Sequence, residues 1–169
     1  MKEVIQLLNA MREAGCIQQY AIFGAMAQSR YTQPAVTLDV DVLVTVPGPE
    51  RIDSLAGIYE FCAARGYRAE GEAVRVGEWP VQLVPVFNAL TREALEQAET
   101  TQFAGLSCRV VRPAYLAVIA LHTGRAKDHD RILALLSSGK LSREEIQTLA
   151  RRHGLSEAWQ RFAGRFLDG

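Results

Sequence analysis

Two aspartates, Asp39 and Asp41, interrupt an apolar segment and are the residues of this sequence whose spacing most directly indicates chemistry. The segment Thr37–Val46 is rich in Val and Leu, which favours a β-strand. Side chains alternate between the two faces of a strand, so both carboxylates should project from the same face. Two carboxylates held side by side repel each other by about 4 kcal/mol near a protein surface. We therefore expect a cation between them.

A glycine upstream extends this pattern toward phosphate binding. The apolar run Tyr20–Phe23 predicts a strand that ends at Gly24, followed by a short helix. A glycine at such a junction lets backbone N–H groups approach a phosphate, and the N-terminus of a helix favours negative charge. Mg²⁺ in proteins takes one or two carboxylates together with substrate phosphates. Gly24, Asp39 and Asp41 together predict a site for a metal-bound polyphosphate.

A second interpretation of the same three residues involves no ligand. Asp39 and Asp41 would then lie on the solvent face of an edge strand, and Gly24 would only turn the chain. The spacing alone is compatible with both interpretations.

The run from residue 125 to residue 131, RAKDHDR, is the densest group of charges in the chain. Arg125 and Lys127 could bind a triphosphate, with Asp128 orienting them. The alternative is the solvated first turn of a helix, where acids lie favourably near the positive end of the helix dipole. The charge pattern alone favours this alternative.

The bulk composition describes an ordinary soluble protein. The chain has 169 residues, 49% of them hydrophobic and 22% charged, with zero formal net charge, so nothing global indicates a nucleic-acid or membrane partner. No apolar run approaches the roughly 20 residues that a membrane span requires. Three widely spaced cysteines show no metal-ligand spacing and predict buried thiols in a reducing cytoplasm.

Helices and strands alternate through the first two thirds of the chain, and helices alone fill the last third. This order predicts a mixed α/β sheet domain over residues 1–112 and a small C-terminal helical subdomain over residues 113–169, packed on it. His129 and His153 are expected at the surface. Strands are predicted at 20–23, 37–46, 73–76, 81–86 and 106–111; helices are predicted from Val4 to Gly15 and at 25–30, 50–65, 91–99, 113–121, 128–136, 143–152 and 155–167.

Four segments resemble the signature of the nucleotidyltransferase superfamily. IFGA at 22–25 and TLDVDV at 37–42 are similar to its strand ending in Gly-Ser or Gly-Gly and its Asp-x-Asp strand. RPAYLA at 112–117 and LHTGRAKD at 121–128 resemble the helical segment of small bacterial AbiEii-type members, which belong to abortive-infection systems. The resemblance covers roughly residues 1–138.

The resemblance implies a nucleotidyltransferase-like sheet flanked by helices and a Mg²⁺-dependent transfer of a nucleoside monophosphate. The donor would be a nucleoside triphosphate and the acceptor a hydroxyl of RNA or protein, with a cognate antitoxin as a further partner. It implies that Asp39 and Asp41 hold the metal and act in catalysis with Lys127 and Asp128. The nucleotide-binding residues that it implies are Gly24, Ala25, Arg125 and Lys127.

The sequence departs from the superfamily pattern at three positions. Ala25 stands where relatives have Gly or Ser, Ala35 where an Arg is frequent, and Gln82 where a third acid is frequent. A neutral amide can be neither a general base nor a strong metal ligand. The alternative function is therefore a nucleotide-binding or partner-binding module of the same fold without turnover.

Overall fold

A mixed sheet forms the centre of the molecule in the computed structural model, which describes residues 1–33, 37, 39–48 and 55–169. Within those residues the sheet has seven strands in the order β3-β4-β5-β2-β1-β7-β6. This confirms the predicted mixed α/β fold class. The strands are β1 (Gln19–Phe23), β2 (Val40–Thr45), β3 (Arg68–Glu70), β4 (Ala73–Val76), β5 (Trp79–Pro85), β6 (Glu99–Phe103) and β7 (Leu106–Val110).

Strand β2 lies in the middle of the sheet and carries one of the two aspartates. It pairs antiparallel with β1 and parallel with β5, and this register places Asp41 between Phe23 and Gln82. Residues directly across neighbouring strands point to the same face. Val40, Val42, Leu43 and Val44 are buried, as expected for a central strand covered on both faces. Asp41 is thus held by the most buried part of the sheet.

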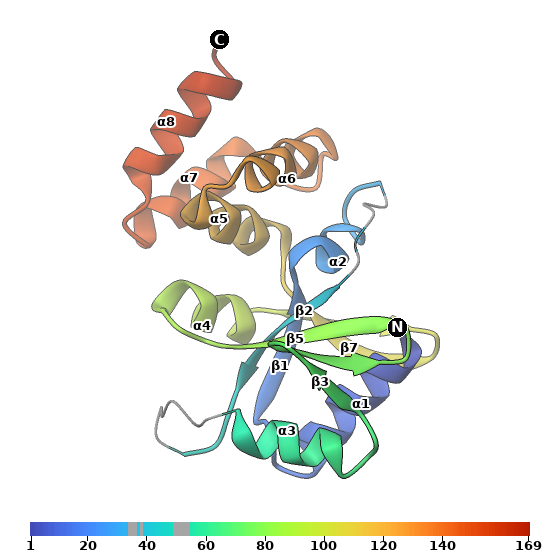
Figure 1. The fold of residues 1–169 in the computed structure, drawn as a ribbon. Coiled ribbons are helices and arrows are strands. Elements are labelled where there is room, and N and C mark those ends of the chain that lie inside the picture. The colour runs from blue at the N-terminus through green and yellow to red at the C-terminus, as the bar shows by residue number, and fades with distance from the viewer. Residues whose placement is uncertain (34–36, 38, 49–54) are drawn as a thin grey trace.

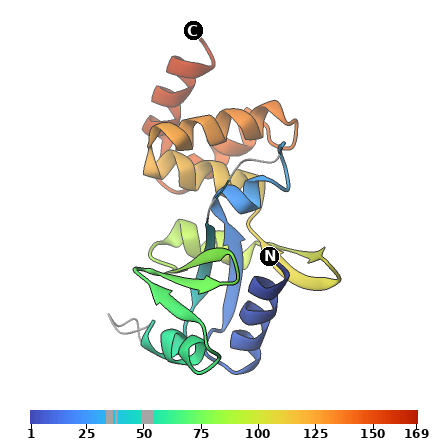
Figure 2. The ribbon, with the colours of Figure 1, turned by 45° about the vertical axis from the view of Figure 1, so that its right-hand side comes forward.

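Most helices lie toward the two ends of the sheet, whereas α4 lies beside its middle, against β1 and β2 (Figure 1, Figure 2). Helices α5 to α8 lie together at one end, next to the short α2, whereas α1 and α3 lie at the opposite end. The helices are α1 (Lys2–Glu13), α2 (Gly24–Gln28), α3 (Ala56–Ala63), α4 (Ala89–Glu96), α5 (Pro113–Thr123), α6 (Ala126–Ser137), α7 (Arg143–Arg152) and α8 (Ser156–Phe166).

Helix α5 is the centre of the C-terminal helices. Seven consecutive residues, from Tyr115 to Leu121, are buried, because α5 packs against α4, α6, α7 and α8. Its boundaries follow the sequence: Pro113 occupies the first turn, and Gly124 ends the helix with φ +70°. A capping box of Ser142 with Glu145 opens α7.

Several predicted elements differ from the observed ones. Strand β2 begins at Val40 instead of Thr37, and α4 begins at Ala89 because Asn88 is its cap, with Thr91 three residues inside. Strands β3 and β6 were not predicted, since RAE and ETTQF lack alternating apolar residues. The predicted helix 50–65 lies partly outside the described residues, and its described part is α3.

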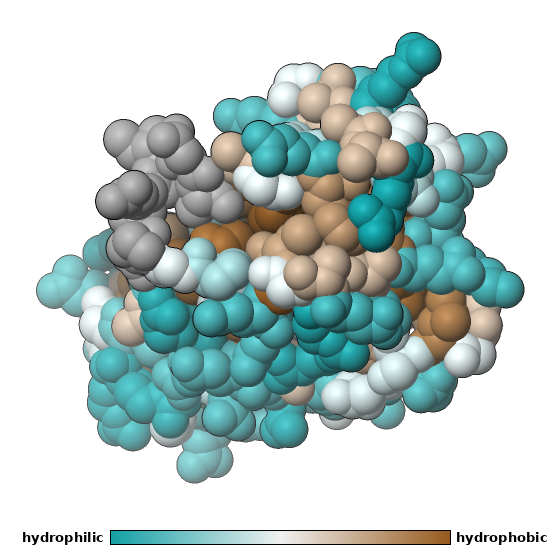
Figure 3. Space-filling view, turned by 90° about the horizontal axis from the view of Figure 1, so that it is seen from below, coloured by the Kyte–Doolittle hydropathy of each residue, from teal (hydrophilic) through white to brown (hydrophobic). Residues whose placement is uncertain are grey.

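No helix in the described part of the chain is long and apolar enough to cross a membrane. Figure 3 shows the face seen from below as largely hydrophilic, with hydrophobic residues gathered near its middle. Cys62 and Cys108 are buried as predicted, whereas Cys16 is partly exposed.

Glu93 on α4 contacts two residues of the C-terminal helices and the residue that ends α7. Its carboxylate accepts a hydrogen bond from Tyr115 Oη at 2.9 Å, lies 2.7 Å from His153 Nε2 and forms an ion pair with Arg152. His153 is therefore not the free surface residue that was predicted. His129 is also partly buried, with its ring packed against those of Phe162 and Phe166.

The contacts of Glu93 predict a pH-dependent contribution to stability. Burial raises the pKa of Glu93, but the hydrogen bonds from Tyr115 and His153 and the charge of Arg152 together lower it below the ordinary 4.5. A lowered pKa stabilises the fold above pH 4.5, and the stabilisation is lost as the pH falls through the folded pKa. Glu93→Gln should lower the free energy of unfolding by about 1 kcal/mol at pH 7 and by less below pH 4, measured by urea unfolding. Glu96→Gln, an exposed position on the same helix, is the control; equal effects of the two variants would contradict this prediction.

Candidate functional site

An open cleft of about 680 Å³ lies between the sheet, α2 and α6. It brings together residues from distant parts of the sequence, including five of the predicted site residues: Ala25, Asp39, Asp41, Arg125 and Lys127. The other described residues that line it are Phe23, Gln28, Thr37, Gln82, Val84, Asp130, Arg131 and Ala134.

Gly24 packs directly against the carboxylate of Asp41. Its φ of +68° lies in the left-handed region, and a Cβ built on it would lie only 2.3 Å from Asp41 Oδ2. Two separate constraints therefore require glycine here: the backbone conformation and the close approach of the carboxylate. The chain leaves β1 and enters α2 at this residue, so the turn and the acid form one unit.

Asp41 carries a negative charge that its surroundings only partly compensate. Burial raises its pKa, and the neighbouring Asp39 raises it further. Arg131, Lys127 and Arg125 act in the opposite direction, yet the net pKa stays above the ordinary value of 3.8. A carboxylate in this situation would gain from a bound cation.

Asp39 reaches the same cleft from outside the strand. It precedes the first residue of β2 and is exposed, and its Oδ1 accepts a hydrogen bond from Thr37 Oγ1 at 3.0 Å. The strand alternation that predicted a shared face therefore does not apply to Asp39. Both aspartates nevertheless line one cleft.

Asp128 lies beneath three cationic residues at the start of α6, Arg125, Lys127 and Arg131, which we call the cations of α6. It is fully buried, and its Oδ2 accepts hydrogen bonds from Arg125 Nε at 2.7 Å and from the Arg125 backbone N–H at 3.2 Å. Its Oδ1 accepts from Arg131 Nη1 at 3.3 Å. Burial raises the pKa of Asp128, but the hydrogen bonds and charge of Arg125, together with the charge of Arg131, lower it below its ordinary value. Asp128 is not among the residues that line the cleft, and the catalytic and orienting roles predicted for it stay predictions.

The sequence interpretation missed Arg131 and Gln28. Arg131 lies three residues after Asp128 and four after Lys127, a spacing that places it on the same side of a helix, so this signal was present. Gln28 accepts a hydrogen bond from Arg131 Nε at 3.2 Å, across 103 residues of sequence. No local pattern indicates such a contact.

Gln82 lies on the strand next to Asp41. The two residues are paired across β2 and β5, and Gln82 lines the cleft. Its Nε2 donates to Glu72 Oε2 at 3.3 Å. A neutral amide thus stands beside the acid pair.

The donor set fits Mg²⁺ bound jointly with a substrate. No group of three or more His, Cys, Asp or Glu side chains that could hold a metal occurs among the described residues. Asp39 and Asp41 supply two carboxylates, the number that Mg²⁺ uses when phosphates and waters complete its shell. Asp39 and Asp41 are therefore the residues of the cleft that could hold such a metal.

Solved structures with a similar fold include an antibiotic-resistance factor and a nucleotidyltransferase-like protein. The solution structure of the antibiotic-resistance factor ANT(2'')-Ia superposes with a TM-score of 0.58 at 13% identity, over 96% of this chain and 95% of that one. A crystal structure of ANT(2'')-Ia with adenylyl-2''-tobramycin gives 0.57 at 14%, over 96% and 97%. An antigenic nucleotidyltransferase-like protein from Paracoccidioides brasiliensis gives 0.54 at 14%, over 95% and 93%.

These likenesses show that the chain has the nucleotidyltransferase fold. No protein-family model matches the sequence, and no curated protein matches it. The similarity to AbiEii-type members therefore stays a prediction from the sequence.

The contact between Gly24 and Asp41 predicts that adding a methyl group at Gly24 destabilises the protein. Gly24→Ala should lower the free energy of unfolding by about 2 kcal/mol or more, since both the left-handed backbone and the clash oppose it. Gly15→Ala is the matched control, because Gly15 has φ +75° but no atom lies within 4 Å of the point that a Cβ would occupy. Denaturant unfolding of both variants would measure the difference, and equal losses would show that Asp41 does not restrict this site.

The raised pKa of Asp41 predicts that the residue destabilises the metal-free protein. Its ionisation opposes folding, so the cost is absent below pH 3.8 and is complete above the folded pKa. Asp41→Asn should raise the free energy of unfolding by about 1 kcal/mol at pH 7 in EDTA, and this gain should vanish near pH 3.5. Urea unfolding at both pH values would test this, with the exposed Glu60→Gln as control. A less stable Asn variant at pH 7 would contradict it.

Proposed function

We propose that the protein is a Mg²⁺-dependent nucleotidyltransferase that moves a nucleoside monophosphate from a nucleoside triphosphate to an acceptor hydroxyl. The observation that carries this proposal is the cleft itself, in which Asp39 and Asp41 face Arg125, Lys127 and Arg131. Acids that suit a metal and cations that suit phosphates are the two halves of a site for a metal-bound nucleotide.

Mg²⁺, held by Asp39 and Asp41, would neutralise charge on the phosphates and polarise the reacting phosphoryl group. The protein's own contribution is alignment and electrostatics. The turn at Gly24 and Ala25 leaves room for the phosphates, and the cations of α6 stabilise negative charge that moves onto the departing pyrophosphate. The acceptor oxygen forms the new bond to the α-phosphorus as the bond to pyrophosphate breaks, and the hydroxyl proton is released to water.

The acceptor that we propose is a hydroxyl of RNA or of a protein. This follows from the resemblance of residues 112–128 to AbiEii-type members, which also supports a role in toxin–antitoxin or phage-defence systems, with a cognate antitoxin, in the cytoplasm. The fold likeness to a protein solved with adenylyl-2''-tobramycin adds a small-molecule hydroxyl to the acceptors that should be assayed.

A second candidate is a module that binds nucleotides but does not turn them over. Gln82 favours it, because this amide lies beside Asp41 where a carboxylate could accept the proton of the acceptor hydroxyl. Binding without transfer would distinguish this candidate from the enzyme.

Transfer should depend on Asp41. Wild type, Asp41→Ala and the control Glu60→Ala should be incubated with Mg²⁺, α-labelled nucleoside triphosphates and a cell extract, RNA or an aminoglycoside. Wild type and control should label an acceptor, and Asp41→Ala should be slower by about a hundredfold. Calorimetry with ATP and Mg²⁺ should accompany the assay. Binding without labelling would favour the second candidate, and neither binding nor labelling would exclude both.

A further inference from the structure

Arg131 is held on two sides before any ligand binds. Its Nε donates to Gln28 Oε1 at 3.2 Å, and its Nη1 donates to Asp128 Oδ1 at 3.3 Å. The side chain is only 15% exposed, yet it lines the cleft. A guanidinium has five N–H donors, so these two bonds leave others for an anion in the cleft.

Gln28 is the residue of α2 that makes this connection to α6. It is the last residue of the helix that begins at Gly24, and it is one of three buried polar or charged residues among those described, with 8% exposure. The side-chain amide oxygen of Gln28 therefore connects the turn at Gly24, on one side of the cleft, to the guanidinium of Arg131 on the other. A buried amide is costly unless it is hydrogen-bonded, so this contact determines how both groups lie.

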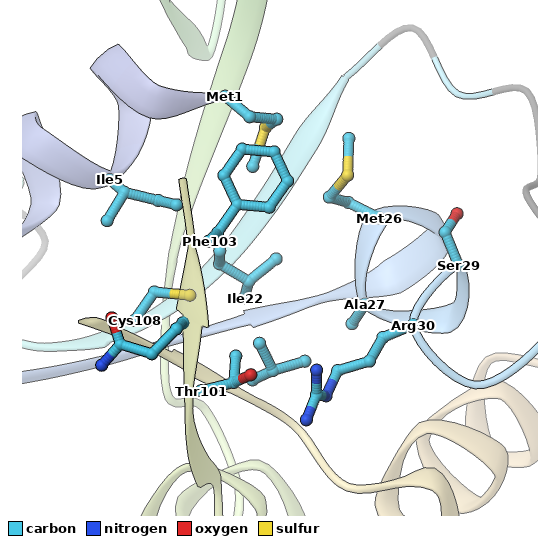
Figure 4. Close-up of a pocket in the computed structure, with 12 residues that line it drawn as sticks. Met1, Ile5, Ile22, Met26, Ala27, Ser29, Arg30, Thr101, Phe103 and Cys108 are labelled. Atoms are coloured by element: carbon cyan, nitrogen blue, oxygen red, sulfur yellow. The ribbon is translucent and has the colours of Figure 1, made fainter. Parts of the chain in front are cut away.

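The opposite flank of α2 is less well supported. Figure 4 shows a second cavity there, lined by Met26, Ala27, Ser29 and Arg30 of α2 and its C-terminal flank together with residues of α1, β1, β6 and β7. Its volume is about 310 Å³. Packing behind α2 is thus incomplete, and the bond from Gln28 to Arg131 is a specific constraint on the cleft side.

We propose that Gln28 is a positioning residue that orders Arg131 to bind the polyphosphate tail of the nucleotide. This inference rests on the proposed function. An arginine that is already ordered loses less conformational entropy when it binds an anion, and a planar guanidinium suits phosphate oxygens. Gln28 therefore favours ligands with phosphates beyond the first one.

The test compares two glutamines that make the same kind of bond. Gln28→Leu removes the acceptor for Arg131, whereas Gln19→Leu removes the acceptor for Arg109, which donates from Nη1 to Gln19 Oε1 at 3.2 Å outside the cleft lining. Calorimetry should measure the binding of ATP and of AMP, each with Mg²⁺. We expect Gln28→Leu to weaken ATP binding about tenfold and AMP binding less than about twofold, with no change for Gln19→Leu.

A double-mutant cycle adds a readout that general destabilisation would not move. Arg131→Lys keeps the charge but loses the Nε donor. The losses of ATP-binding free energy caused by the two single substitutions should therefore not add in the Gln28→Leu/Arg131→Lys protein. If the Leu variant unfolds at the assay temperature, Gln28→Asn replaces it in the same cycle, since it keeps an amide that is too short to reach Arg131.

The outcomes separate this inference from the function on which it rests. Equal weakening of ATP and AMP, unchanged ATP binding or additive losses would overturn the role of Gln28 while leaving the nucleotide site intact. A wild-type protein that binds neither nucleotide would overturn the proposed function, and the role of Gln28 with it.

Discussion

The arrangement of the cleft depends on one unfavourable electrostatic situation, the carboxylate of Asp41 half enclosed beside a second acid. The turn at Gly24 leaves no room for a side chain between itself and this carboxylate. The central position of β2 prevents the strand from moving to relieve the repulsion. What remains is attraction from across the cleft, and the cations of α6 supply it. The geometry of the turn, the strand and the helix can therefore be understood from the charge that they surround.

Asp41 and Asp128 show how surroundings give one residue type opposite properties. Asp128 is the more buried of the two, yet its pKa is lowered by the hydrogen bonds and charge of Arg125 and by the charge of Arg131. Asp41 receives no such bond in the described contacts, and its pKa is raised. Asp128 is thus an internal counterion that keeps the arginines in place, whereas Asp41 is a negative charge available to a ligand. Burial alone does not distinguish these roles; the hydrogen-bond donors do.

The parts of the cleft that could be predicted are those with a local signal. Gly24 lies at a strand end, and Asp41 interrupts an apolar run, so short segments sufficed to bring them together. Arg125 and Lys127 looked like a solvated helix start, and only the resemblance connected them to the cleft. Gln28 could not be predicted, because its importance comes from a contact with a residue 103 positions away. Likewise β6 escaped prediction, because ETTQF forms an edge strand through pairing with β7 and not through its own pattern.

The acid pair and the cations of the cleft come from two stretches of chain that lie far apart in sequence. The first stretch supplies the acids from β2 and the residue before it, and the second supplies the cations only after α5 and α6 have docked. Contacts of such long sequence separation form late, because loop closure must precede them. A ligand that bridges both stretches binds the fully assembled chain and not its partly folded forms, and so shifts the folding equilibrium toward the native state by mass action. The fraction of protein that binds the ligand would then report the fraction of chains that have folded completely.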